Sequence, residues 1–133
     1  VLHWWTGTPY ETSRAVELGC YFSINATGMR DSALSRSLPI DRILTETDHP
    51  YGDRGGDSPR PGKVAVVESA IARLHLATPE LVRRQMWQNL RTLVSELRLS
   101  DRLNRQIRAY LAAMPGASAI EGQFPPEQLP FPD

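Results

Sequence analysis

Hydrophobic residues along the chain follow two spacings, one typical of buried strands and the other of amphipathic helices. Short apolar runs rich in aromatic and β-branched residues predict strands. Stretches with apolar side chains three and four positions apart predict helices. The strands are expected at residues 1–6, 20–25 and 42–45, and the helices at residues 8–18, 31–38, 63–76, 78–97 and 101–114. Strands that alternate with helices in this order indicate a parallel sheet covered by helices.

Several helix ends are predicted by local chemistry. Thr8 and Thr78 can each cap a helix, and each precedes a proline, which suits the first helical position. Glu11 completes a capping box with Thr8, and Gly19 is placed to end that first helix. The last helix is expected to be capped by Ser100.

The number of predicted strands limits the α/β fold class, because three strands cannot close a barrel. A complete barrel of eight strand–helix units takes roughly 250 residues, whereas this chain has 133. The pattern leaves two folds open: a small open α/β unit, or the last third to half of a larger barrel. The chain begins with a predicted strand and no polar lead-in, as expected of a fragment, a processed chain or a misassigned start.

Composition excludes some classes of protein. The 15 basic and 15 acidic side chains balance, so the whole chain has no charge that attracts nucleic acid or anionic lipid. Lys63 is the only lysine, and the other cations are arginines, which suit phosphate; a GC-rich genome would produce the same bias. No apolar run approaches the ~20 residues of a membrane span. Cys20 has no second cysteine to pair with and is expected to be a packing residue. We expect a cytoplasmic protein.

Candidate chemistry gathers at the ends of two predicted strands. His3 lies on the first strand, and Glu46 and Asp48 follow the third. Parallel α/β folds bind ligands at the carboxyl ends of their strands. Because side chains alternate along a strand, Glu46 and Asp48 should share a face while Thr47 points away. Two neighbouring carboxylates repel each other unless a cation or proton intervenes, and a divalent metal with His3 as a further ligand would meet that need.

Spacing alone also fits plainer roles for these residues. A histidine on a strand is more often packed or hydrogen-bonded than bound to a metal. The triplet Asp48-His49-Pro50 is also typical of a turn or a helix cap. The glycine-rich stretch at residues 52–56 lacks the Gly-Lys-Ser/Thr ending of a phosphate-binding loop.

Four segments together resemble one known family. They are His3-Trp4-Trp5-Thr6-Gly7, similar to a His-x-Phe-(Thr/Ser)-Gly segment; residues 17–25, similar to its next strand; residues 38–51, similar to Leu-Pro-x-Asp-Arg-(Leu/Ile)-Leu-x-Glu-Thr-Asp-x-Pro-Tyr; and Asn89, similar to the asparagine of its final helix. They occur in the family's order and cover about residues 1–97. On these motifs the chain resembles the TatD-type metal-dependent deoxyribonucleases. The sequences of its motifs are most similar to a branch of the family found in anti-phage defence operons (Qat-type).

The resemblance implies a TIM barrel of the amidohydrolase type that binds two divalent ions and cuts DNA phosphodiesters as an exonuclease. Residues 1–97 would then be about strands six to eight with their helices. His3 would be the metal ligand at the end of strand six, and Asp48 the strand-eight ligand that activates water. Glu46 would orient a ligand or the water. The implied cofactor is magnesium or manganese, with zinc as a further candidate, and the implied partner is single-stranded DNA or duplex ends.

Four further residues are candidate substrate contacts: Trp5, His49, Tyr51 and Arg60. Trp5 is expected to share a strand face with His3, where it would line the site or stack on a base; packing inside the barrel is an equal alternative. Arg60 lies in the long loop at residues 46–62 and would hold a phosphate. Residues 98–114 would add a C-terminal helix, and the proline-rich residues 115–133 are expected to be extended or disordered.

The chain departs from the family in its ligands. The family's strand-one His-x-His pair, strand-four glutamate and strand-five histidine have no counterpart. A chain with two ligands should bind metal poorly and cut DNA slowly or not at all. Three hypotheses follow: a part of a DNase that associates with itself or with the missing barrel half, an inert half-barrel that serves as a scaffold, or a small-molecule hydrolase of the same superfamily.

Overall fold

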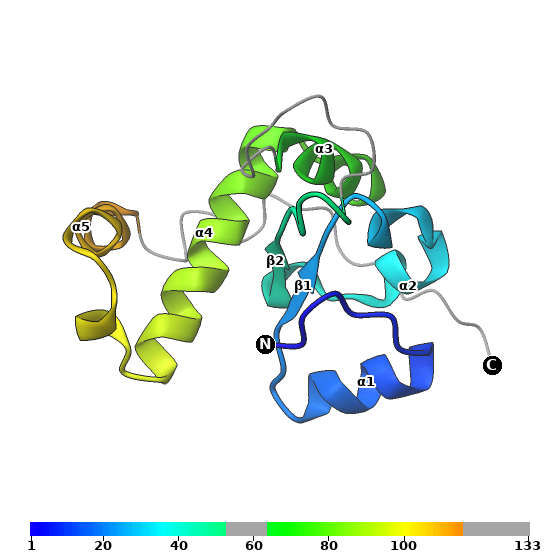
Figure 1. Ribbon diagram of the computed structural model, residues 1–133, viewed down its shortest axis with the longest axis horizontal. Helices are drawn as coiled ribbons and strands as arrows, with labels where there is room; N and C mark the ends of the chain where they lie inside the picture. The colour runs from blue at the N-terminus through cyan, green and yellow to red at the C-terminus, as the bar shows by residue number, and fades with distance from the viewer. Residues whose placement is uncertain (53–63, 116–133) are drawn as a thin grey trace.

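The computed structural model describes residues 1–52 and 64–115. In them a small parallel sheet lies among helices (Figure 1). The α-helices are α1 (Pro9–Glu17), α2 (Ser32–Ser37), α3 (Ala65–Leu74), α4 (Pro79–Glu96) and α5 (Arg105–Ala113). The strands are β1 (Phe22–Ile24) and β2 (Ile43–Thr45), and the 3-10 helices are η1 (Gly28–Arg30), η2 (Ile40–Arg42) and η3 (Ser100–Arg102). These residues form a mixed α/β fold, as predicted. Arg60 and the predicted tail beyond residue 115 lie outside the described residues.

The two strands pair in parallel, with Phe22 opposite Ile43 and Ile24 opposite Thr45. Both strands are shorter than the apolar runs that predicted them. Leu2 adds one isolated parallel bridge to Phe22, so the start of the chain lies along the other edge of β1. The order across the sheet is therefore the N-terminal segment, β1 and β2.

The predicted strand at residues 1–6 is wrong apart from that bridge. The backbone turns at Trp4, whose φ of 45° is left-handed and incompatible with an extended strand. Its N–H donates to Oε1 of Glu46, with the nitrogen 3.1 Å from the oxygen. Because the chain turns between them, the expectation that His3 and Trp5 share a strand face is also wrong.

The start of α1 follows its predicted local chemistry. The hydroxyl of Thr8 accepts from the N–H of Glu11, and the Glu11 carboxylate accepts from the N–H of Thr8. Gly19 follows the helix with φ 73°, in the left-handed region that a glycine adopts most easily. The hydroxyl of Thr78 likewise accepts from the N–H of Leu81 at the start of α4.

The predicted start of the last helix is wrong by several residues. Ser100 begins the short helix η3, and α5 begins only at Arg105. Asn104 is extended and its side chain accepts from the N–H of Ile107, which makes it the cap. Asparagine is as good an N-cap as serine, so the sequence offered two competing starts four positions apart.

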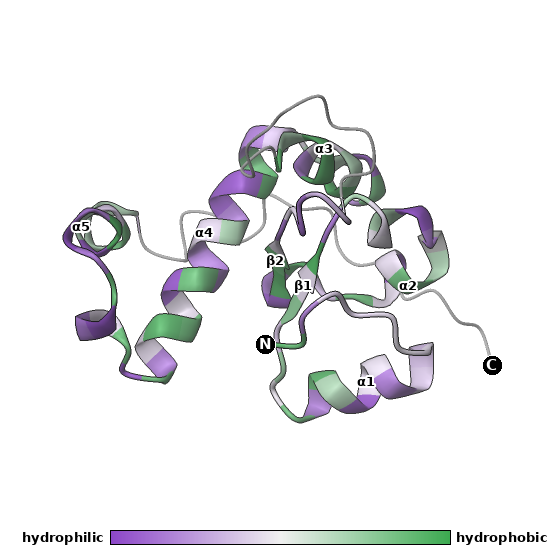
Figure 2. Cartoon of the chain, in the orientation of Figure 1, coloured by the Kyte–Doolittle hydropathy of each residue, from purple (hydrophilic) through white to green (hydrophobic). Residues whose placement is uncertain are grey.

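Helices α3 and α4 pack together beside the sheet, and α4 contacts β2 (Figure 1). The buried core joins these elements through ten residues: Ala15, Phe22, Ile24, Leu38, Ile43, Val67, Ile71, Ala72, Val82 and Met86. Hydrophobic residues make up most of both strands and much of α3 (Figure 2). Each helix in the described ranges is too short or too polar to cross a membrane.

Two buried polar side chains attach α4 to its neighbours. The Nδ2 atom of Asn89 donates to the carbonyl oxygens of Ile40 and Ile43, at 2.8 and 2.7 Å, and so ties α4 to the start of β2. The carboxylate of Glu68 on α3 is buried and accepts from Nε and an Nη atom of Arg83 on α4. These bonds satisfy groups that would otherwise be costly to bury.

Candidate metal centre

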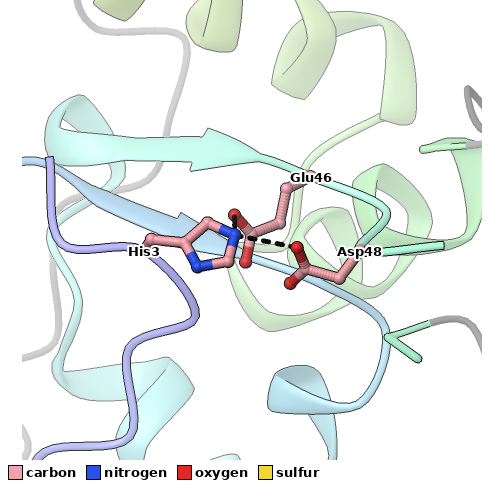
Figure 3. Close-up of side chains that lie close together, drawn as sticks. All are labelled: His3, Glu46 and Asp48. Atoms are coloured by element: carbon pink, nitrogen blue, oxygen red, sulfur yellow. Dashed lines mark hydrogen bonds and ion pairs between the residues drawn. The ribbon is translucent and has the colours of Figure 1, made fainter. Parts of the chain in front are cut away.

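Three potential ligands meet at the carboxyl end of the sheet (Figure 3). His3 follows the Leu2 bridge, and Glu46 comes directly after β2. The Nε2 atom of His3 lies 2.8 Å from Oδ1 of Asp48 and 3.3 Å from Oε2 of Glu46. One ligand atom from each residue lies within 4.8 Å of the other two. The structure therefore brings together the three residues that the sequence proposed.

Hydrogen bonds fix the backbone conformation at Glu46 and in the turn that begins at Asp48. The N–H of Glu46 donates to the carbonyl of Ile24, which continues the pairing of the two strands one residue past β2. Asp48 then adopts φ 44°, a left-handed conformation that aspartate tolerates better than most residues. The Asp48 carbonyl accepts from the N–H groups of Tyr51 and Gly52, which closes a tight turn. Left-handed residues of this kind are concentrated at functional sites.

Gly52 has no room for a side chain in this turn. A Cβ atom there would lie 2.5 Å from the carbonyl oxygen of Thr47 and 2.7 Å from Cβ of Asp48. It would also lie 3.0 Å from Cγ of Asn25. The glycine thus lets the turn fold back against the carboxylate, a role that the sequence interpretation missed.

Strand β1 and the residue directly after it supply polar partners to both carboxylates. The hydroxyl of Ser23 donates to Oε2 of Glu46, and Nδ2 of Asn25 donates to Oδ2 of Asp48 at 2.7 Å. The sequence interpretation missed both residues. Their alternation on β1 was a usable signal, because side chains two positions apart on a strand share a face.

The surroundings of the two carboxyl groups shift their pKa values in opposite directions. The side chain of Glu46 is 13% exposed and that of Asp48 is 15% exposed. Burial, reinforced by the neighbouring Asp48, raises the pKa of Glu46 to about 7. Burial also opposes ionisation of Asp48, but hydrogen bonding with Asn25, Glu46 and His3 holds its pKa below the usual value. Near neutral pH the cluster therefore holds an ionised Asp48 beside a Glu46 that exchanges its proton.

The donor chemistry of the cluster fits a divalent cation. It offers one imidazole nitrogen and two carboxylates, all ordinary ligands of zinc, magnesium or manganese. Burial is the largest cause of the raised pKa of Glu46, and the second carboxylate, that of Asp48, adds an imbalance of negative charge. A bound cation would remove that imbalance. His3 is 67% exposed, so the centre opens to solvent on the histidine side.

The candidate substrate contacts lie in different surroundings. The indole of Trp5 donates from Nε1 to the buried hydroxyl of Thr12 and packs against Phe22, with ring centroids 5.6 Å apart. This is the packing alternative considered for Trp5. His49 adjoins Asp48 in the turn, and Tyr51 is 74% exposed. Arg60 lies outside the described residues.

Comparison with known proteins identifies similar sequences. The family of TatD related DNase matches residues 1–95. The "Putative deoxyribonuclease TATDN1 homolog" of Enterocytozoon bieneusi (strain H348) is 36% identical over 52 residues. That match covers 38% of this chain and 19% of the relative, so the matched part is a small share of the relative's length.

Proposed function

The chain belongs to the TatD related DNase family, and we propose that it supplies His3, Glu46 and Asp48 to the metal centre of a hydrolase that cuts DNA phosphodiester bonds. The observation that carries the proposal is the convergence of these three side chains at the carboxyl end of the sheet. Ligands in parallel α/β folds bind at this end. Family membership implies a TIM barrel, and residues 1–97 would form its last three strand–helix units.

His3 and Asp48 would hold the cation, through Nε2 and the carboxylate. When bound, a divalent cation supplies Lewis acidity, which lowers the pKa of a water molecule and offsets the charge of a phosphate. Asp48 is ionised near neutral pH, since its pKa is lowered. Asp48 would also accept a proton from the attacking water molecule. Glu46, whose Oε2 lies 3.3 Å from Nε2 of His3, would orient a ligand or that water molecule.

The substrate would approach from the exposed side of His3. Tyr51 lies in the turn that begins at Asp48 and exposes most of its ring, which favours stacking on an unpaired base. His49 lies in the same turn and is a second candidate contact. Stacking on bases suits single-stranded DNA or frayed duplex ends, and magnesium or manganese suits a ligand set rich in carboxylate oxygen.

A second candidate function is favoured by the small number of ligands. Within the described ranges, His3, Glu46 and Asp48 form a single cluster of potential ligands, enough for one ion. The outer edge of β2 also has no further strand among those residues, and a free strand edge is a template for pairing. A non-catalytic half-barrel that pairs with another chain would explain both features.

Metal-dependent degradation of labelled single-stranded DNA tests the proposed function. The full chain should degrade DNA slowly with magnesium or manganese, because it lacks the family's other ligands, and not at all with a chelator. Asp48→Asn should lower the rate by about 100-fold or more, since it removes both a ligand and the charge. Asp101→Asn is the matched control, because Asp101 lies on η3 with a side chain that is 98% exposed.

The outcomes separate the candidates. Equal rates in wild type and Asp48→Asn would contradict the proposed site. Manganese binding without DNA cleavage would favour the non-catalytic half-barrel. Turnover of an ester or amide without DNA cleavage would instead identify a small-molecule hydrolase.

A further inference from the structure

Two side-chain hydrogen bonds link the carboxyl end of β1 to the residues that follow β2. Ser23 donates to Glu46 and Asn25 donates to Asp48, and both bonds span 23 positions. Ser23 lies in β1 and Asn25 directly after it, two positions apart, so their side chains point to the same side of the extended chain. Each carboxylate of the candidate centre therefore has its own partner on the neighbouring strand.

Asn25 is the more constrained of the two partners. It is fully buried, and both ends of its carboxamide are bonded. Its Oδ1 accepts from the N–H of Gly28 at 2.9 Å, while Nδ2 donates to Oδ2 of Asp48 at 2.7 Å. The Gly28 bond fixes which way the amide faces, because an N–H can only donate to the oxygen. The nitrogen of Asn25 must therefore face Asp48.

This bond divides the two oxygens of Asp48 between different partners. Oδ2 is held by Asn25, and Oδ1 lies 2.8 Å from Nε2 of His3, toward the candidate centre. A carboxylate without such a partner can rotate and present either oxygen or both. The carboxamide is neutral, so it orients Asp48 without cancelling the charge that attracts a cation.

The segment after Asn25 holds the same turn by its backbone. The N–H and the hydroxyl of Thr27 both donate to the carbonyl of Gly52, at 3.2 and 2.9 Å. Gly52 in turn lies against Asn25 and Asp48 without room for a Cβ atom. The start of η1 thus fixes the backbone of the turn, while Asn25 fixes the side chain that the turn presents.

We propose that Asn25 is a positioning residue that holds Asp48 with Oδ1 turned toward the candidate centre, before any cation arrives. The inference rests on the proposed function, since it assumes that Asp48 is a ligand. Outer partners that orient a ligand typically contribute about 10- to 100-fold in metal affinity. Replacing Asn25 by a side chain of similar size that cannot donate should lose that factor.

The affinity is measured by titrating the full chain with manganese. The readout is the paramagnetic broadening of backbone NMR signals near Trp4 and Asp48. Asn25→Leu should bind manganese about 10- to 100-fold more weakly than wild type. Asn89→Leu is the matched control, because Asn89 is also buried, at 2% exposed, but donates to the carbonyl oxygens of Ile40 and Ile43 near the start of β2. The control variant should lose stability and keep its affinity for manganese.

A double-mutant cycle separates positioning from general loosening of the fold. Asn25→Leu should weaken binding in a His3→Ala background, where Asp48 remains to be oriented. It should have little further effect in an Asp48→Asn background, where the carboxylate is gone. An equal effect in both backgrounds would overturn the positioning role.

A test on the unmodified protein covers the case in which Asn25→Leu fails to fold. The side-chain amide hydrogens of Asn25 should exchange with solvent much more slowly than those of Asn104, which caps α5 at the surface. Equally fast exchange would overturn the inference. Wild-type binding with unchanged affinity in Asn25→Leu would overturn it too and leave the proposed function standing. If the wild-type chain does not bind manganese, both the proposed function and the positioning role are overturned. The exchange rates of the Asn25 amide hydrogens would not change that conclusion.

Discussion

The Nε2 atom of His3 lies 2.8 Å from Oδ1 of Asp48, although 45 positions separate the two residues. The approach is produced by the order of the sheet. The Leu2 bridge aligns the start of the chain with β1, and β1 pairs in parallel with β2, so that all three segments end at the same edge. Residues placed just after each segment then face a common point, where hydrogen bonds hold them.

The contribution of Glu46 to the stability of the metal-free protein should fall as pH rises from about 4.5 to about 7. Burial raises the pKa of Glu46 from its usual 4.5 to about 7. In this window the unfolded chain has lost a proton that the folded chain keeps, so a higher pH favours unfolding. The effect is up to roughly 3 kcal/mol. Urea denaturation with a chelator at several pH values measures it.

Glu46→Gln should flatten that pH dependence, because glutamine does not titrate. Asp48 does not obscure the result. Its pKa is lowered from 3.8, so its stabilising contribution is present throughout this window and is lost only at lower pH. The same slope in wild type and Glu46→Gln would contradict the assignment.

Gly52→Ala should weaken manganese binding, whereas Gly19→Ala should not. A Cβ at residue 52 would press on the Thr47 carbonyl and on Asp48, and would move the ligand. At Gly19 the surroundings are open, but the φ of 73° disfavours alanine, so that variant should lose about 1 kcal/mol of stability. Titration calorimetry and denaturation of both variants check the contrast; equal affinities would contradict it.

Arg83→Met should destabilise the fold more than Glu68→Leu combined with Arg83→Met. Glu68 is buried and accepts three hydrogen bonds from Arg83. Removing the arginine alone leaves a buried charge unpaired, at a cost of roughly 1–3 kcal/mol, whereas removing both partners leaves an apolar contact between α3 and α4. Chemical denaturation of the two variants gives the comparison, and a double variant that is the less stable of the two would refute it.

Manganese should stabilise the wild-type chain against heat and should stabilise His3→Ala much less. A ligand at ten times its dissociation constant contributes about 1.4 kcal/mol to stability. His75→Gln is the control, because His75 is the C-cap residue of α3 and is not one of the clustered ligands. That variant should change the starting stability and keep the shift that manganese produces. A full shift in His3→Ala would exclude the histidine as a ligand.

Local chemistry explains where sequence interpretation succeeded and where it failed. The start of α1 was predictable because Thr8 and Glu11 bond to each other within one helical turn. The first strand was not, because the left-handed backbone of Trp4 is held by Glu46, which is 42 positions away. The start of α5 was misplaced because Asn104 and Ser100 are both suitable caps, and only the folded chain selects one.

The sequence by itself determined the alternation of helices with parallel strands and, through its motifs, the candidate ligands His3, Glu46 and Asp48. Only the tertiary structure decided that Ser23 and Asn25 hold the two carboxylates, and that Glu46 keeps its proton to about pH 7. The reason is physical. Periodicity and capping depend on neighbours within a few positions, whereas register, burial and the sharing of hydrogen bonds depend on which distant segments the sheet brings side by side.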